Sequence, residues 1–147
     1  MNNLASLYRS QGKYDLAEPL YVQCMEKKRA VLGESHPDTL GSVNNLAALY
    51  YYQGKYDLAE PLYVQCLEKS RAVLGESHPD TLSSVNNLAG LYENQGKYDL
   101  AEPLYVQCLE KRRAVLGESH PSTLASVNNL NGIYRAQGKH DKIVSLS

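Results

Sequence analysis

The stretch that decides the fold is PDTLSSVNNLAGLYENQGKYDLAEPLYVQCLEKRRAVLGESH, which occupies residues 79–120 of the 147-residue chain. Nearly the same 42 residues precede it at 37–78, and the pattern begins once more at residue 121. Self-similarity at a fixed spacing of about 20–50 residues is the signature of a repeat architecture. We therefore expect a single repeat domain over residues 1–147, with a partial repeat at 1–36, full repeats at 37–78 and 79–120, and a C-terminal partial repeat at 121–147.

The first half of each repeat predicts an amphipathic helix, here called helix A. Between Pro79 and Gln95 the apolar residues recur three and four positions apart, which places them on one face of a helix. A proline is favoured in the first turn of a helix, and either Ser77 or His78 is expected to cap the start. Gly96 is expected to end the helix, because glycine readily takes the left-handed conformation found there.

The second half of each repeat predicts another helix, here called helix B. In the repeat quoted above it spans Asp99–Leu116, with Asp99 and Glu102 expected to form a capping box and Gly117 to follow its end. No stretch alternates between apolar and polar residues as a strand does. Each repeat is therefore an antiparallel helical pair, and stacking of neighbouring pairs completes the core of an all-α solenoid.

Composition argues against several classes of partner. The chain carries 15 basic and 16 acidic residues, so neither nucleic acid nor an anionic membrane surface is indicated as a partner. No apolar run approaches the roughly 20 residues that a membrane-spanning helix needs. Three cysteines, an odd number placed one per repeat at Cys24, Cys66 and Cys108, favour a reducing compartment and a cytoplasmic location.

The spacing of small and aromatic residues identifies a family resemblance. At Leu46, Ala47, Tyr50, Gly54, Tyr56, Ala59 and Tyr63 the repeat resembles the tetratricopeptide repeat. Its 42-residue length, with Asn-Asn-Leu-Ala, Ala-Glu-Pro-Leu-Tyr and Leu-Gly-x-x-His-Pro, resembles the kinesin light chain type. The resemblance implies a right-handed superhelical solenoid, and it implies that a concave groove lined by helix A binds extended peptides.

Candidate catalytic and metal-binding residues have simpler structural explanations. His36, His78 and His120 recur once per repeat, and neighbouring repeats would hold them too far apart to share one metal ion. The cysteines fall on the apolar stripe of helix B, where a small side chain is wanted. Because no phosphate loop or catalytic constellation appears either, we expect no enzymatic activity, no cofactor and no metal.

The residues that differ between repeats gather on one face of helix A. At 100° per residue, Gly41, Asn45, Ala48 and Tyr52 lie opposite the packed stripe, Asn44 and Tyr51 flank this face on one side, and Leu49 flanks it on the other. An amide side chain offers donors and an acceptor that match a peptide group. The predicted groove residues are therefore an asparagine ladder with its neighbours (Asn3, Asn45, Asn87, Asn129, Asn44 and Asn86) and variable residues that select side chains (Arg9, Tyr51, Tyr52, Glu93, Asn94 and Arg135).

Two functions fit this pattern. The preferred one is a non-enzymatic scaffold for protein–protein interaction that binds an extended peptide of unknown identity in the helix A groove. The alternative is a purely structural array that acts as a spacer or associates end to end through its incomplete terminal repeats, whose apolar surface is open. Drift of exposed positions after duplication would also produce variation on helix A, although helix B is exposed too and varies little.

Overall fold

The computed structural model describes residues 2–143, with side chains from residue 4 onward. Within these residues the fold is all-α, as predicted, and no strand is present. The elements are α1 (Asn2–Ser10), α2 (Tyr14–Leu32), α3 (Pro37–Tyr52), α4 (Tyr56–Leu74), α5 (Pro79–Asn94), α6 (Tyr98–Leu116), α7 (Pro121–Ala136) and a short 3-10 helix, η1 (His140–Lys142). Helix A of successive repeats is thus α1, α3, α5 and α7, and helix B is α2, α4 and α6.

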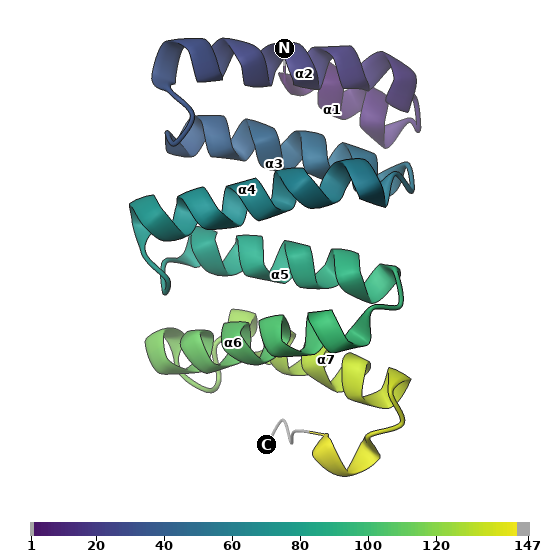
Figure 1. The fold of residues 1–147 in the computed structure, drawn as a ribbon, viewed down its shortest axis with the longest axis vertical. Coiled ribbons are helices and arrows are strands. Elements are labelled where there is room, and N and C mark those ends of the chain that lie inside the picture. The colour runs from purple at the N-terminus through teal and green to yellow at the C-terminus, as the bar shows by residue number, and fades with distance from the viewer. Residues whose placement is uncertain (1, 144–147) are drawn as a thin grey trace. The chain divides into compact units, whose positions relative to one another are not determined.

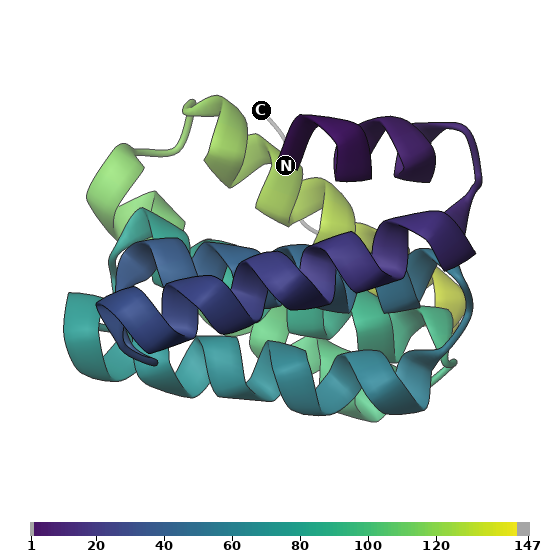
Figure 2. The ribbon, with the colours of Figure 1, turned by 90° about the horizontal axis from the view of Figure 1, so that it is seen from above.

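The chain divides into two compact units, Met1–Val73 and Leu74–Ser147. In the first unit, α1 to α4 follow one another as antiparallel neighbours, and in the second α5 to α7 do the same (Figure 1). Figure 2 shows the reversal of the chain between α1 and α2, drawn in the darkest purple. Consecutive antiparallel packing within each unit is the arrangement that the repeat pattern predicts.

Each of the helices α3, α5 and α7 begins in the same way. A proline is the first helical residue, and the histidine before it caps the helix: His78 Nδ1 accepts a hydrogen bond from the Asp80 backbone N–H at 3.1 Å. His36 and His120 make the equivalent bonds, also at 3.1 Å. The histidines are therefore caps, which settles the choice that the sequence left between serine and histidine.

The predicted capping box of helix B is wrong. The residue before α6 is Lys97, whose side chain makes no capping bond, and Asp99 is already the second residue of the helix. The connection from α5 is short, because Gly96 has a φ of 75° and the Lys97 N–H donates to the Tyr92 carbonyl at 2.8 Å. The Lys97 carbonyl then accepts the first bonds of α6, so the helix begins before an aspartate cap could form. Asp99 still stabilises the helix start through its charge.

Helix A is packed on two sides. Val43 and Leu46 lie in the core as expected, but Leu49 is also fully buried, at 0% exposure, whereas the helical wheel placed it at the edge of the open face. It belongs to a cluster with Tyr21 and Met25 of α2, the helix B of the preceding repeat. A helix A therefore contacts the preceding helix B as well as its own, which a single-helix periodicity does not reveal.

Candidate functional site

The open face of helix A is where the sequence places it. On α3, Gly41, Asn45 and Tyr52 are exposed and Ala48 is half-buried, while Thr39 and Leu46, which point to the other side, are buried. Tyr52 is the most open of the large side chains there, with 58% of its surface exposed. The side chains of repeat-to-repeat variable positions thus reach solvent together on this helix.

The asparagines of neighbouring repeats are bonded to each other. Asn129 Nδ2 on α7 donates to Asn86 Oδ1 on α5 at 3.0 Å. The two residues are of different kinds in the sequence, because Asn129 belongs to the row at the centre of the open face and Asn86 to the row at its edge. At this point one member of the predicted row, Asn129, is bonded to an asparagine of the neighbouring helix A.

A second pair shows the same register between neighbouring helices. The Arg9 guanidinium carbon on α1 lies 5.6 Å from the centre of the Tyr52 ring on α3, a cation–π contact. Arg9 and Tyr52, like Asn86 and Asn129, are separated by 43 residues in the chain. Within each unit, a residue on one helix A therefore faces the residue 43 positions later, which is one 42-residue repeat plus one residue.

In the first unit the open face is aromatic. Tyr51 contacts Tyr52 edge to face with ring centres 5.4 Å apart, and it contacts Tyr56 at 5.7 Å. Tyr63 of α4 lies beneath, buried, and burial raises the pKa of its phenol well above the usual value, with smaller contributions from the neighbouring tyrosines. Together with Arg9 these rings form a patch suited to apolar, aromatic or anionic groups.

In the second unit the corresponding face is polar. The Tyr105 hydroxyl of α6 donates to Glu93 Oε1 at 2.8 Å, and Asn94 Nδ2 donates to the Gly90 carbonyl of its own helix at 2.9 Å. Arg135 of α7 is exposed. The two units thus present different chemistry at equivalent positions.

The predicted site residues fall into three groups. Those on open surface are Asn45, Tyr52, Asn94 and Arg135, and the half-buried ones are Arg9, Asn44, Tyr51, Asn86, Asn87, Glu93 and Asn129. The side chain of Asn3 lies outside those that the structure describes. Sequence reasoning missed Tyr105, because a tyrosine on the apolar stripe of helix B signals core packing and gives no sign that its hydroxyl reaches helix A.

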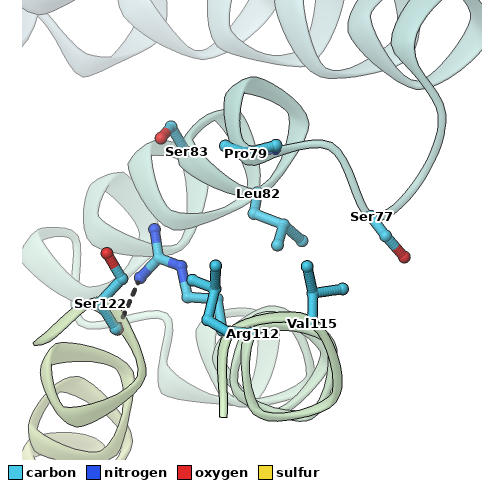
Figure 3. A pocket seen from close by; sticks show the side chains of 8 residues that line it. Ser77, Pro79, Leu82, Ser83, Arg112, Val115 and Ser122 are labelled. Atoms are coloured by element: carbon cyan, nitrogen blue, oxygen red, sulfur yellow. Dashed lines mark hydrogen bonds between the residues drawn. The ribbon is translucent and has the colours of Figure 1, made fainter. Parts of the chain in front are cut away.

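A small hollow opens at the other end of the helices in the second unit. Its cavity volume is about 80 Å³, and Ser77, Pro79, Leu82, Ser83, Arg112, Val115, Leu116 and Ser122 line it (Figure 3). Arg112 Nη1 donates to the Ser122 carbonyl at 3.2 Å and to Ser126 Oγ at 2.8 Å, so the guanidinium joins α6 to α7. Pockets that enclose a drug-sized ligand are typically about 300–1,000 Å³. The hollow is a packing feature with a structural arginine.

The cysteines of the second and third repeats are buried, as their place on helix B predicts. The Cys66 thiol donates to the Leu40 carbonyl at 3.4 Å and the Cys108 thiol to the Leu82 carbonyl at 3.6 Å. Burial raises the pKa of Cys66 to about 12 and raises that of Cys108 as well. Cys24 is half-buried. Because the thiolate is the nucleophile, the two buried thiols are poorly suited to covalent chemistry.

Alkylation should separate these thiols. At pH 8, iodoacetamide is expected to modify Cys24 in the native protein and to spare Cys66 and Cys108 until urea unfolds the chain, because both their access and their thiolate form are suppressed. Mass spectrometry of tryptic peptides separates Cys24 from the two buried thiols, which lie in peptides of identical sequence, residues 56–69 and 98–111, and are therefore measured together. Fast labelling of this shared peptide with helix content intact would contradict the buried placement.

Other chemistry is not indicated in the part of the chain that the structure describes. No group of three or more histidine, cysteine, aspartate or glutamate side chains there could hold a metal ion. Nor does any helix in that part have the length and apolar character that crossing a membrane requires.

Comparison with known proteins agrees with this geometry. The tetratricopeptide repeat family model matches residues 1–68, 40–105 and 80–146. The chain belongs to the tetratricopeptide repeat family. Its members are generally scaffolds for protein interaction.

The similar solved structures are of the kinesin light chain type. One is the crystal structure of nearly identical TPR-like repeats from a protein named as a kinesin light chain of Podosopora anserina, which is 30% identical with a TM-score of 0.87 and covers 98% of this chain and 68% of that one. Another is BtubC (BKLC) from P. vanneervenii, 27% identical with a TM-score of 0.85, covering 95% of this chain and 56% of that one. These matches support the solenoid fold of stacked helical pairs.

A curated relative matches over a single repeat length. It is a nucleotide-binding leucine-rich repeat (NLR)-like protein of Hyaloscypha variabilis, 56% identical over 43 residues, which are 29% of this chain. The match spans only 4% of that protein's length. The matched segment is therefore a small part of a much longer protein.

Proposed function

We propose that the chain is a non-enzymatic protein-interaction scaffold in which each of the two units binds an extended peptide segment along the open face of its helix A elements. The observation that carries this proposal is the hydrogen bond between Asn129 and Asn86. It uses one donor of Asn129 and the acceptor of Asn86, which leaves the Asn129 oxygen and the Asn86 amino group for a ligand. A peptide group presents the complementary N–H and C=O.

The spacing of the helices suits an extended chain. Packed helices lie about 8–10 Å apart, and an extended peptide advances about 3.3 Å per residue. A bound segment would therefore advance about three residues from one helix to the next. Asparagine amides would bond its backbone, while neighbouring residues that differ between repeats would contact its side chains.

The variable positions give each unit its own preference. In the first unit Tyr51, Tyr52 and Arg9 form an aromatic and cationic patch, whereas the second unit presents Glu93 and Asn94. Exposed apolar patches on a protein surface often mark interaction sites, and Tyr52 is 58% exposed beside the half-buried Tyr51. The free thiols also suit a reducing compartment, and we place the protein in the cytoplasm on that basis.

Selection from a library of random 12-residue peptides tests the proposed function. The immobilised full chain is expected to enrich a set of related sequences whose binding to the chain, followed by fluorescence anisotropy, is saturable and micromolar or tighter. Heat-unfolded chain is the control and should enrich none of them. Failure of the native chain to enrich any sequence above this control would contradict peptide binding.

Self-association is a second candidate function, supported by the open face of α1. Leu4 and Leu7 are 46% and 51% exposed, whereas their counterparts Leu46 and Leu49 are buried under α2. A second copy of the chain would cover these leucines. Light scattering over a concentration series should then show an increase in mass that Leu4→Gln with Leu7→Gln abolishes, and a strict monomer throughout would count against it.

A further inference from the structure

We infer that the open face around Glu93 in the second unit is a subsite for a basic side chain, lysine or arginine, of the bound peptide. This inference rests on the proposed function and adds to it the chemistry of one ligand residue. Four observations lead to it: the way in which the carboxylate is held, its uncompensated charge, the room around it and the contrast with the first unit.

The Glu93 carboxylate is held in place by a neighbouring helix. The Tyr105 hydroxyl, whose residue is only 3% exposed, donates to Glu93 Oε1 at 2.8 Å. Tyr105 is fixed by its burial, so the bond orients the carboxylate at the surface. One oxygen is thus engaged, and Oε2 is the atom that a ligand cation would meet. A positioned acceptor loses less freedom on binding than a mobile surface glutamate does.

The charge of Glu93 is not compensated by the protein. Among the side chains of residues 4–143, ion pairs involve Glu34, Glu76, Glu102 and Glu118, and none includes Glu93. A half-buried carboxylate keeps only part of its hydration and can exchange that water for an ammonium or guanidinium group, and a charge-assisted hydrogen bond is among the stronger polar contacts. A basic ligand side chain supplies that partner.

Two glycines leave room beside the carboxylate. A methyl group at Gly132 of α7 would lie 3.9 Å from Glu93 Oε2, and one at Gly90 of α5 would lie 3.7 Å from the Tyr105 hydroxyl. Neither glycine has a positive φ, so neither is required by the backbone. Glycine within a helix costs about 0.5–1 kcal/mol relative to alanine. Both distances are ordinary van der Waals contacts, so alanine would fit at either position and would cover part of the surface beside Glu93.

The first unit lacks this arrangement. Position 51 there holds a tyrosine where the second unit has Glu93, position 48 holds an alanine where it has Gly90, and Arg9 adds a positive charge. A basic ligand group would meet no carboxylate at that point and would be repelled by Arg9. The preference for a basic residue is therefore assigned to the second unit alone.

Parallel selections on the wild type and on Glu93→Gln test the subsite. The glutamine keeps the acceptor for Tyr105 and loses only the charge. Lysine or arginine should be enriched at one position of the peptides selected on wild type, and this enrichment should disappear on the variant. The affinity of a selected peptide should fall about tenfold, the scale expected for one hydrogen bond to a charged group. Replacing that basic residue by glutamine in the peptide should remove the difference between the two proteins.

Controls make the outcome specific. Glu110→Gln removes the same charge from the exposed side of helix B and should leave the affinity unchanged. Gly132→Ala should raise the melting temperature of the protein and lower its affinity for the basic peptide. An unchanged affinity would refute the need for open space beside Glu93. Peptides enriched without a basic preference, or with one that survives Glu93→Gln, would overturn the subsite but leave peptide binding intact. If the native chain enriches no peptide, the proposed function fails and the subsite fails with it.

Discussion

Replacing Leu49 by alanine should lower the free energy of unfolding by about 2–5 kcal/mol, the range measured for large-to-small changes at buried positions. Leu49 is 0% exposed and lies in the cluster of Tyr21 and Met25 from the preceding helix B. Removing its side chain would leave a cavity between two repeats. Urea unfolding followed by circular dichroism measures the loss.

Leu7→Ala is the matched control for this change. Leu7 occupies the same repeat position but is 51% exposed on α1, so at concentrations where the chain is monomeric its replacement should alter the free energy of unfolding by no more than about 0.5 kcal/mol. The two variants share the residue type, the helix type and the substitution, and they differ only in how deeply the leucine is buried. Equal losses at the two positions would contradict the packing of helix A against the preceding repeat.

The helices were predictable from the sequence because proline and glycine mark their ends so regularly. Pro79 begins α5 and Gly96 follows its end by two residues, close to the limits that the repeat pattern indicates. The start of α6 was missed, since an aspartate three residues before a glutamate also fits the first turn of a helix that has already begun. Whether Asp99 caps or follows the cap depends on how tightly the chain turns at Gly96, which the residue types alone do not specify.

The open face of helix A was predictable in part. Periodicity correctly separates Asn45 from Leu46, because one face of a helix must be apolar. It misplaced Leu49, because the wheel of one helix contains no information about a second neighbour. The pairing of Asn86 with Asn129 was equally inaccessible, since the one-residue offset between neighbouring helices follows from how their side chains interlock.

The likeness of the units concealed their difference in chemistry. Comparing repeats position by position identifies Glu93 and Tyr51 as equivalent, and it shows that one is acidic and the other aromatic. It does not show that Tyr105 holds the Glu93 carboxylate or that Gly132 lies beside it, because these contacts join three helices. The proposed specificity therefore depends on side-chain contacts between helices, which are visible only in the structure.

If helix A asparagines bond the backbone of a bound peptide, removing two of them should weaken peptide binding. Asn45→Ala with Asn87→Ala takes one amide from the open face of each unit. A library-selected peptide should bind this double variant at least about tenfold more weakly, because peptide groups would lose their hydrogen-bond partners. Circular dichroism should show unchanged helix content, since alanine favours a helix more than asparagine does.

The matched control removes two amides from helix B instead. Gln65→Ala with Gln107→Ala changes equivalent positions of α4 in the first unit and α6 in the second, and should leave the affinity as it is in the wild type. Fluorescence anisotropy titration of the same labelled peptide against all three proteins is the decisive measurement. A tenfold loss confined to the asparagine variant is the predicted result, and equal affinity for all three proteins would contradict binding by the helix A asparagines.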